Sequence, residues 1–427
     1  MNPLPQRLKE LVPGNRYWTA IFFIFFCAFL LPFGSGPVKT SFYFGILLPA
    51  LLFSTWQEVR CLAGSRHFLA ILALCTYAMV RSTDLDTVLD ILKALVSFLV
   101  LTLGAMKLPT IQPASVKRAA LLCITLLLIY VFSNAAYQGI TQGWTPGMRL
   151  GPLFGNLENV IFCTVLMVSV LVVYSWSCLA TRDYRALVIA NAVVIIAALW
   201  LMQSRSALPT WLGSMAILLA YVIPSQEQRR ILPWLLLSLL AIAALAFPVL
   251  LERGDSYRLE IWADYLTSMR DCGTLFGCGW GLEHPFTTKS GLTIVHPHSM
   301  YVQHLFWGGI TGLALLLLAL VPPLIAGIRR AHFAAWALLP GCIALAFDGK
   351  GLMTSQPNQR WFLATVPLAF LIAGLLGKTA TSATSPGKKL DIKARCRSAN
   401  AKCSGTSHQD HAPPSSPVSD QLFPDRR

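Results

Sequence analysis

The chain has 427 residues, of which 55% are hydrophobic and only 12% are charged. Soluble domains carry about 25% charged residues, so this composition excludes an ordinary soluble protein, and the low charge excludes disorder over most of the chain. The formal net charge is +15. Basic inner loops and an anionic membrane surface explain this charge in a polytopic membrane protein, so we expect no nucleic acid partner.

Apolar runs long enough to cross a bilayer follow one another along the chain. They predict twelve transmembrane helices, near residues 17–33, 41–55, 67–80, 89–106, 119–134, 157–176, 186–202, 207–223, 231–251, 299–322, 332–347 and 361–377. The runs are continuously apolar, without the alternation of β-barrel strands, so the predicted fold class is an all-α polytopic membrane protein. The second and third runs are short, which leaves tilted or re-entrant segments open.

Lys and Arg residues beside these runs predict the orientation. With the N-terminus inside, fourteen of them fall in inner segments and six in short outer loops, as the positive-inside rule requires. Both termini are therefore expected in the cytoplasm. Residues 1–377 form the predicted transmembrane catalytic domain. Residues 378–427, rich in Ser, Thr, Pro and Lys, are predicted to be a disordered basic cytoplasmic tail beside membrane lipids.

One outer segment, residues 252–298, is much longer than the others. Long ordered loops in compact proteins are usually functional. This loop holds three of the eight His residues and the run GCGWG at 277–281. It also holds Cys272 and Cys278, for which the sequence leaves both a disulfide and two free thiols open.

Four arginines are candidates for binding a phosphorylated ligand on the outer side: Arg81, Arg149, Arg205 and Arg258. Guanidinium groups bind phosphate oxygens bidentately and stay charged when buried, so several of them on one face suit a diphosphate. Arg205 lies in QSRSA between two spans, where the alternative is an interfacial arginine that reaches lipid head groups. The alternative for Arg258 is an ordinary ion pair with Asp255 or Glu260.

The segment IVHPHSMYVQH carries His296, His298 and His304. No Asp, Glu or Cys in the same segment completes a metal site with the H-x-H pair, so we expect no metal. A neutral imidazole at the mouth of a span suits a general base, although a histidine that anchors a helix end has the same pattern. His304 is predicted to lie in the core. The chain has no P-loop, dinucleotide-binding motif or H-E-x-x-H motif, so no cofactor is expected.

Three stretches in a fixed order carry a resemblance to a known family: SRSALPTWL, YRLEIWADYLTSMRDCGTLFGCGWG and HPHSMYVQHLFWGGITGLALLLLAL. Over residues 190–325 the chain resembles the superfamily of O-antigen ligases and O-antigen polymerases. The matching pattern is Ser204-Arg205, then Arg258 to Trp262 leading to G-x-G, then His298 before an apolar helix. The chain departs from many members at Ser299, where they have Asn.

This resemblance implies a GT-C-like bacterial inner-membrane protein whose large periplasmic loop contains short helices. It implies transfer of a glycan from undecaprenyl diphosphate to lipid A–core oligosaccharide, with inversion and without metal or ATP. Arg205 and Arg258 would then bind the donor diphosphate, with Arg149 and Arg81 as weaker candidates. His298 would be the base for the acceptor hydroxyl, with His296 as its neighbour or substitute.

These motifs do not identify the acceptor. The H-x-H form favours the ligase, while a polymerase and a protein O-oligosaccharyltransferase of the same superfamily stay as alternatives. A lipid or solute transporter is the alternative outside enzymes. A transporter would need charges at the membrane midplane, and only Lys93, with Asp90 nearby, lies inside a predicted span.

Overall fold

The computed structural model describes residues 14–30, 34–109, 111–143, 150–222, 233–234, 237, 240–241, 244, 257–287, 291, 293–349, 351–352 and 354–381. By its internal contacts the chain divides into Met1–Lys378 and Thr379–Arg427. Nearly all of the second unit lies outside the described residues, so the disordered tail stays a prediction. Arg149 and most of the ninth predicted span, 231–251, lie outside them as well.

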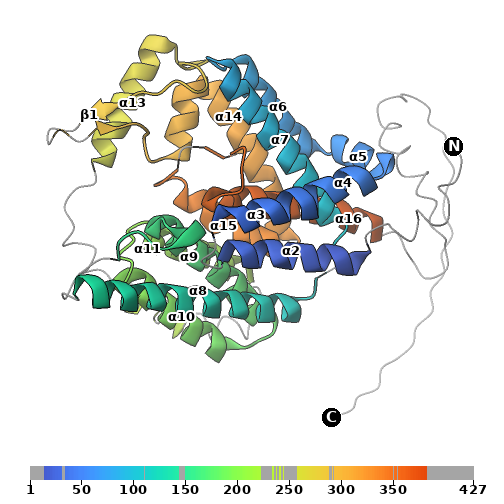
Figure 1. Cartoon of the computed structure of the whole chain (residues 1–427), viewed down its shortest axis with the longest axis vertical. Helices are drawn as coiled ribbons and strands as arrows, with labels where there is room; N and C mark the ends of the chain where they lie inside the picture. The colour runs from blue at the N-terminus through green and yellow to red at the C-terminus, as the bar shows by residue number, and fades with distance from the viewer. Residues whose placement is uncertain are drawn as a thin grey trace, which may run out of the picture. The chain divides into compact units, whose positions relative to one another are not determined.

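The described residues are almost entirely helical (Figure 1). The elements are α2 (Asn15–Leu30), α3 (Ser35–Thr40), η1 (Ser41–Leu47), α4 (Leu48–Phe53), α5 (Trp56–Ala63), α6 (Arg66–Val80), α7 (Leu85–Met106), α8 (Pro113–Gln142), η2 (Gly155–Leu157), α9 (Val160–Ala180), α10 (Tyr184–Trp200), α11 (Ala207–Val222), α13 (Arg258–Cys272), β1 (Phe286–Thr287), β2 (Thr293–Ile294), α14 (Met300–Arg329), α15 (Phe333–Ala344), η3 (Trp361–Thr365) and α16 (Val366–Thr381).

Apart from the ninth, each predicted span coincides with a helical segment, although the segments at 35–53, 113–142 and 300–329 extend six to eight residues beyond a predicted bound. In the described part of the chain, five helical segments are long and apolar enough to cross a membrane, or six if α5 and α6, bent by 76°, form one span. Five shorter apolar helices accompany them. The all-α, multi-pass membrane fold is thus confirmed. The number twelve remains a prediction.

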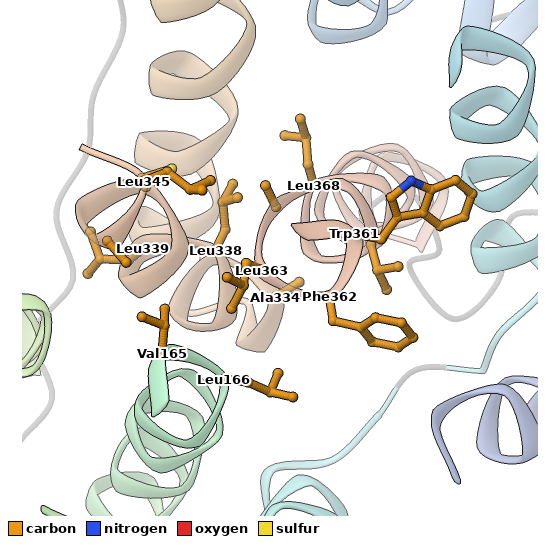
Figure 2. Packing of buried hydrophobic residues seen from close by; sticks show 14 of the residues in the cluster. Val165, Leu166, Ala334, Leu338, Leu339, Leu345, Trp361, Phe362, Leu363 and Leu368 are labelled. Atoms are coloured by element: carbon orange, nitrogen blue, oxygen red, sulfur yellow. The ribbon is translucent and has the colours of Figure 1, made fainter. Parts of the chain in front are cut away.

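Helix α9 lies at the centre of the core. It packs against α8, α10, α11 and α15, and nearly all of its residues from Cys163 to Leu179 are buried. A helix enclosed on every side has no need of a polar face, and α9 is correspondingly apolar around its circumference. Figure 2 shows Val165 and Leu166 of α9 beside side chains of α15 and η3. Asn159 caps the start of α9 by accepting hydrogen bonds from the backbone N–H groups of Ile161 and Phe162.

The helices have a loop end, defined here as the end carrying residues 257–299 and 346–360, and an opposite end. At the loop end, the Gln359 side chain donates to the carbonyl of Asn156 at 2.7 Å, and the Asn156 side chain donates to that of Ala28 at 3.4 Å. These bonds join the start of η3 to the segment before α9 and to the end of α2. At the opposite end, Lys117 forms a 2.6 Å ion pair with Asp183.

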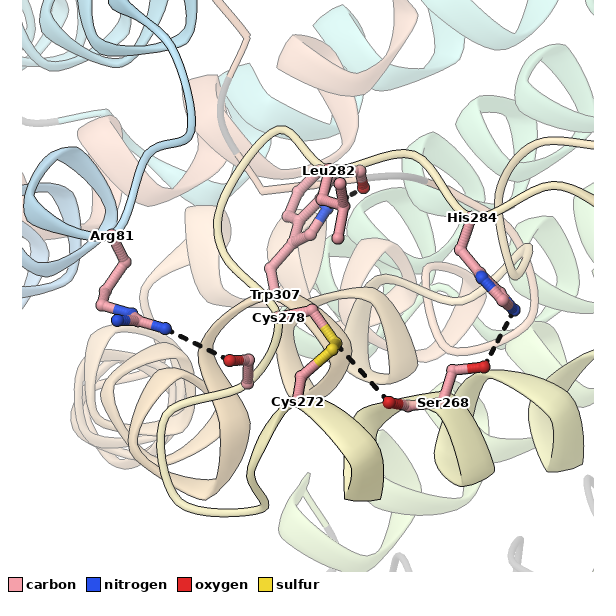
Figure 3. The surroundings of a disulfide bond; sticks show 8 residues. Arg81, Ser268, Cys272, Cys278, Leu282, His284 and Trp307 are labelled. Carbon is pink, nitrogen blue, oxygen red and sulfur yellow. Dashed lines mark hydrogen bonds between the residues drawn. A yellow bond between two sulfur atoms is a disulfide. The ribbon is translucent and has the colours of Figure 1, made fainter.

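The long segment between α11 and α14 contains α13 and a short antiparallel hairpin. In the hairpin, Phe286 pairs with Ile294 and Thr287 with Thr293. A disulfide joins Cys272 and Cys278, so of the two states left open by the sequence the structure has the disulfide (Figure 3). The predicted short helix inside this loop is present as α13, which lies beside α14.

Residues 274–280 of the loop fit into a break in α14. Gly309 has φ 62° and ψ −160°, which interrupts the helix. Around this break, Cys278 N–H donates to Phe306 O at 2.8 Å, and Ile310 N–H donates to Thr274 O at 3.0 Å. A Cβ at Gly309 would lie 2.4 Å from the Leu275 carbonyl carbon, so only glycine allows this close approach. The loop is therefore held by backbone hydrogen bonds to a membrane helix.

Candidate active site

Left-handed backbone conformations in non-glycine residues mark the three motifs. Among the described residues, such conformations occur at Arg182, Gln203, Tyr257, His298 and Ala331. Arg182 and Ala331 directly follow helix ends, where this conformation is ordinary. Gln203 precedes Ser204-Arg205, Tyr257 precedes Arg258, and the third is His298 itself. Strained backbone of this kind, at about 1–3 kcal/mol each, clusters at functional sites.

His298 and Asp348 form a hydrogen-bonded pair at the loop end. Nδ1 of His298 lies 3.3 Å from Oδ1 of Asp348, fifty residues further along the chain. His298 precedes Ser299, which caps α14 by accepting from Val302 N–H, and Asp348 follows α15. Met300 N–H donates to Leu345 O at 2.8 Å, which holds the two helix ends together. Because Nδ1 faces the carboxylate, Nε2 is the ring nitrogen left for a substrate proton.

The burial of the two partners differs. The Asp348 residue is only 6% exposed, whereas the His298 side chain is 34% exposed. A buried carboxylate needs compensating charges or hydrogen bonds. His296 lies on the other side of His298, with 4.2 Å between the ring centroids. The structure thus places both predicted histidines together, and His298 contacts the carboxylate of Asp348.

Arg258 lies within electrostatic reach of this pair. Burial lowers the pKa of its guanidinium, the negative charge of Asp348 opposes that change, and the positive charge of Arg205 adds to it. Arg258 therefore lies within electrostatic reach of both Arg205 and Asp348. Within the described part of the chain, the Arg258 guanidinium has no side-chain hydrogen bond or ion pair, so the surface pair with Glu260 does not form. Asp255 lies outside the described residues.

Helix α13, which begins at Arg258, is hydrogen-bonded to the segment that leads to His298. The Trp262 indole N–H donates to Pro297 O, directly before His298, at 2.8 Å. Tyr265 O–H donates to His284 O at 2.7 Å. The His284 ring lies 2.6 Å from Asp264 and 3.1 Å from Ser268, both on α13 (Figure 3 shows the bond to Ser268). One face of α13 is therefore fixed by the segment that leads to His298.

Arg360 is a further arginine near the pair, and the sequence did not single it out. It lies just before η3. Burial lowers the pKa of its guanidinium, and the negative charge of Asp348 opposes that change. Across the described residues, its side chain makes no hydrogen bond or ion pair. Asp348 is thus the shared neighbour of His298, Arg258 and Arg360.

Arg81 has a different environment. Its guanidinium donates to Gly277 O at 3.2 Å, and its carbonyl accepts from Trp280 N–H at 2.8 Å (Figure 3). It therefore anchors the end of α6 to the loop segment seated in α14. No contact among the described residues joins it to Asp348. Its role in diphosphate binding stays a prediction, as does that of Arg149, which lies outside the described residues.

His304, predicted to be a core residue, is only 3% exposed. Its Nδ1 bonds to its own helix at Met300 O, at 2.8 Å, and its ring contacts Trp280 edge to face. It also lines a cavity of about 400 Å³ between α6, α7 and α14, together with Arg360. The core placement of His304 is confirmed.

The arrangement combines a histidine whose second nitrogen is held by a carboxylate with buried arginines beside it. Such a histidine can accept a proton from a hydroxyl group, and a carboxylate at Nδ1 stabilises the imidazolium that results. Buried guanidinium groups stabilise an oxyanion, above all a phosphate that gains charge as it leaves. The site therefore suits group transfer from a phosphorylated donor to a hydroxyl.

Comparison with known proteins agrees with this chemistry. No family model matches the chain. An O-antigen ligase of Pseudomonas aeruginosa is 29% identical over 371 residues, which cover 78% of this chain and 84% of that protein. The chain is thus similar to an O-antigen ligase over most of its length. The resemblance indicated by the three motifs is confirmed, and it extends well beyond residues 190–325.

Two residues of this O-antigen ligase relative carry no signal in the motifs. Asp348 follows a predicted span directly, and an acidic residue at such a place is a signal that could have been used. Arg360 was counted only as an outer basic residue in the orientation argument. Both are distant in sequence from the motifs, and the packing of α15 and η3 brings them to the site.

Proposed function

We propose that this protein transfers an O-polysaccharide from undecaprenyl diphosphate to lipid A–core oligosaccharide, on the periplasmic face of a bacterial inner membrane. The hydrogen bond between His298 and Asp348, with Arg258 beside it, is the observation that carries this proposal. The ligase relative supports the family of the reaction. The identity of the donor, the identity of the acceptor and the side of the membrane on which they react are parts of the proposal.

In the proposed reaction, the acceptor hydroxyl attacks the anomeric carbon from the side opposite the diphosphate. The new bond joins the acceptor oxygen to that carbon, and the hydroxyl proton moves to Nε2 of His298. The bond between the anomeric carbon and the phosphate oxygen breaks, and its electron pair leaves with the diphosphate. Arg258 and Arg205 stabilise that developing charge, and the product has inverted configuration.

The leaving group in this scheme needs cations rather than a carboxylic acid, because a diphosphate leaves as an anion. In the part of the chain that the structure describes, no three His, Cys, Asp or Glu side chains gather as a metal site requires. A metal-free transfer is part of the proposal. A purified transfer assay should keep its activity in EDTA, and activity restored by a divalent ion after loss in EDTA would contradict the proposal.

The membrane face rests on the distribution of Lys and Arg. Reporter fusions at Gln226 and Thr287 are expected to report opposite sides, with Thr287 in the periplasm. A cytoplasmic signal from both positions would contradict the proposed orientation of the loop.

The acceptor is tested with the lipopolysaccharide ladder of a strain that lacks this protein. Loss of all attached O-chains is expected for a ligase. A single attached repeat would instead identify a polymerase, the second candidate in the same superfamily. An unchanged ladder would contradict both.

A further inference from the structure

Two cavities lie end to end along the same helices near Arg360. One is an apolar groove of about 340 Å³ between α2, α8, α9, α15 and α16. The other is a cavity of about 490 Å³ at the loop end, lined by polar residues that include Asn156, Asn159, Asn358 and Arg360. We call them the apolar groove and the polar cavity.

Three chain segments contribute to both cavities in the same order. Phe162 lines the polar cavity and Leu166, one turn further into α9, lines the apolar groove. Likewise Arg360 lines the polar cavity, while Phe362, two residues on, lines the groove. In the same way, Gly34 lines the polar cavity and Leu30, at the end of α2, lines the apolar groove. At about 1.5 Å per helical residue, the two cavities are neighbours along the membrane normal.

The groove has the composition of a binding surface for one flexible apolar chain. Phe22, Phe26, Phe333 and Phe370 line it, with small residues such as Ala119 between them. Along α2 it runs from Leu30 to Thr19, which is about 16 Å and roughly half of the hydrocarbon thickness. A narrow groove between helices suits a single chain. A lipid with several acyl chains would spread over a wider face.

The polar cavity places a half-buried cation beside the end of this groove. Arg360 has no side-chain partner among the described residues, and it faces Asp348, the neighbour of His298 and Arg258. Glu158 lines the same cavity but is exposed. Arg360 also lines the cavity at His304, where the acidic residues are Asp90 and Glu283, both exposed. Guanidinium groups such as those of Arg360 and Arg258 bind phosphate oxygens bidentately, which suits a phosphorylated head group.

We propose that the apolar groove binds the polyprenyl chain of the donor and that Arg360 binds its diphosphate, between the lipid tail and the reaction centre at His298. This inference rests on the proposed function, since it assigns a place to that donor. It adds a phosphate-binding residue outside the recognised motifs and selects one groove of the transmembrane domain.

The test measures binding in the absence of acceptor, so no transfer is required. Undecaprenyl diphosphate and undecaprenol, which lacks the phosphates, are titrated into the purified full-length protein, and bound lipid is measured by native mass spectrometry. Arg360→Ala should weaken diphosphate binding about tenfold or more and leave undecaprenol binding unchanged. Ala119→Trp fills the groove and should weaken binding of both lipids.

Matched controls separate these effects from general damage. Arg270→Ala removes an exposed arginine at the end of α13, and Ala136→Trp adds the same bulk to an exposed position on α8 outside the described cavities. Both should bind like the unmodified protein. Arg360→Lys keeps the charge but loses the bidentate geometry, so it should fall between Arg360→Ala and the parent.

Different results contradict the two proposals. The groove assignment would be wrong if Arg360→Ala and Ala119→Trp bound both lipids as the parent does. It would also be wrong if phosphatidylglycerol or lipid A displaced undecaprenyl diphosphate equally well. Either result would leave the proposed function unaffected. The proposed function would be wrong if the lipids bound as expected but deletion of the protein left the lipopolysaccharide ladder unchanged. That combination would leave the assignment of the lipid site unaffected.

Discussion

Basic side chains at the two ends of the transmembrane helices differ in their partners. At the opposite end, Lys107 and Lys117 each lie 2.6 Å from a carboxylate, Glu58 and Asp183 respectively. At the loop end, the half-buried side chains of Arg258 and Arg360 have no hydrogen-bond partners in the described residues, and both lie within electrostatic reach of one carboxylate, that of Asp348. The two lysines of the opposite end each contact a carboxylate directly, whereas the two arginines of the loop end share one neighbouring carboxylate.

This difference has an energetic meaning. Burying a cation without a partner is costly, so a protein retains such a cation where a ligand completes the site. Surface ion pairs such as those of the opposite end contribute little to stability or to ligand binding. The comparison therefore predicts large effects on activity at the loop end and small effects at the opposite end.

The largest effect is expected at His298. Replacing it by Ala or Gln removes the group that accepts the proton, and a positioned base contributes about 10²–10⁴-fold to rate. Transfer in a purified assay should fall by this factor while donor binding stays normal. His296→Ala should weaken transfer less, because His296 contacts the base through its ring. Near-normal turnover in His298→Ala would move the base elsewhere, with His296 the first alternative.

The next effect is expected at Arg258. Its Ala variant should lose about 10²–10³-fold in turnover, as when one donor to a developing oxyanion is removed. Arg258→Lys should recover only part of this loss, because the planar fork that matches phosphate is absent. Arg205→Lys should behave in the same way. Full activity of Arg258→Ala, at a normal level of protein in the membrane, would assign Arg258 to an ordinary surface role.

A smaller effect is expected at Asp348. Asp348→Asn keeps the size of the side chain but removes the charge that stabilises a protonated His298. Loss of a hydrogen bond to a charged group corresponds to about 10–10²-fold in turnover. Asp86→Asn changes an exposed carboxylate in the first turn of α7 and is the matched control. Unchanged turnover in Asp348→Asn would reduce the pair to a structural contact.

The smallest effect is expected at the opposite end. Hydrogen bonds from Lys117 and from the backbone N–H of Ala186 lower the pKa of Asp183 below its ordinary value of 3.8. A carboxylate with a lowered pKa stabilises the folded state above that value and loses this contribution as the pH falls below it. Asp183→Asn should therefore leave transfer unchanged and lower Tm slightly at pH 7, with the difference shrinking as the pH falls through the lowered pKa of Asp183. A clear loss of transfer would contradict the division between the two ends.

The sequence predicted the helices well because hydropathy and length act locally. Eleven of the predicted spans coincide with described helices, and Arg258 and His298 were found from short motifs. Asp348 and Arg360 were missed for the opposite reason, since their roles depend on how α15 and η3 pack against α14. No local sequence pattern predicts that the carboxylate beside His298 comes from a residue fifty positions further along the chain.

The break in α14 was equally hidden. Its run of residues is apolar throughout, so hydropathy predicts one continuous span. The pair Gly308-Gly309 was recognised as part of a family motif, but the sequence does not show that a loop occupies the break. The disulfide between Cys272 and Cys278 was left open for a similar reason, because spacing alone does not give the separation of two Cα atoms.

The loop segment seated in α14 also orders events during biosynthesis. Residues 274–280 emerge from the ribosome before α14, yet the carbonyls of Phe306 and Trp307 accept two of their N–H groups, and Arg81, made much earlier, accepts that of Trp280. Until α14 is inserted, the loop lacks its two partners on that helix, the carbonyls of Phe306 and Trp307. Until the loop arrives, Ile310 and Thr311 leave unpaired N–H groups in an apolar environment. Insertion of this helix and closure of the loop are thus a single coupled step of assembly.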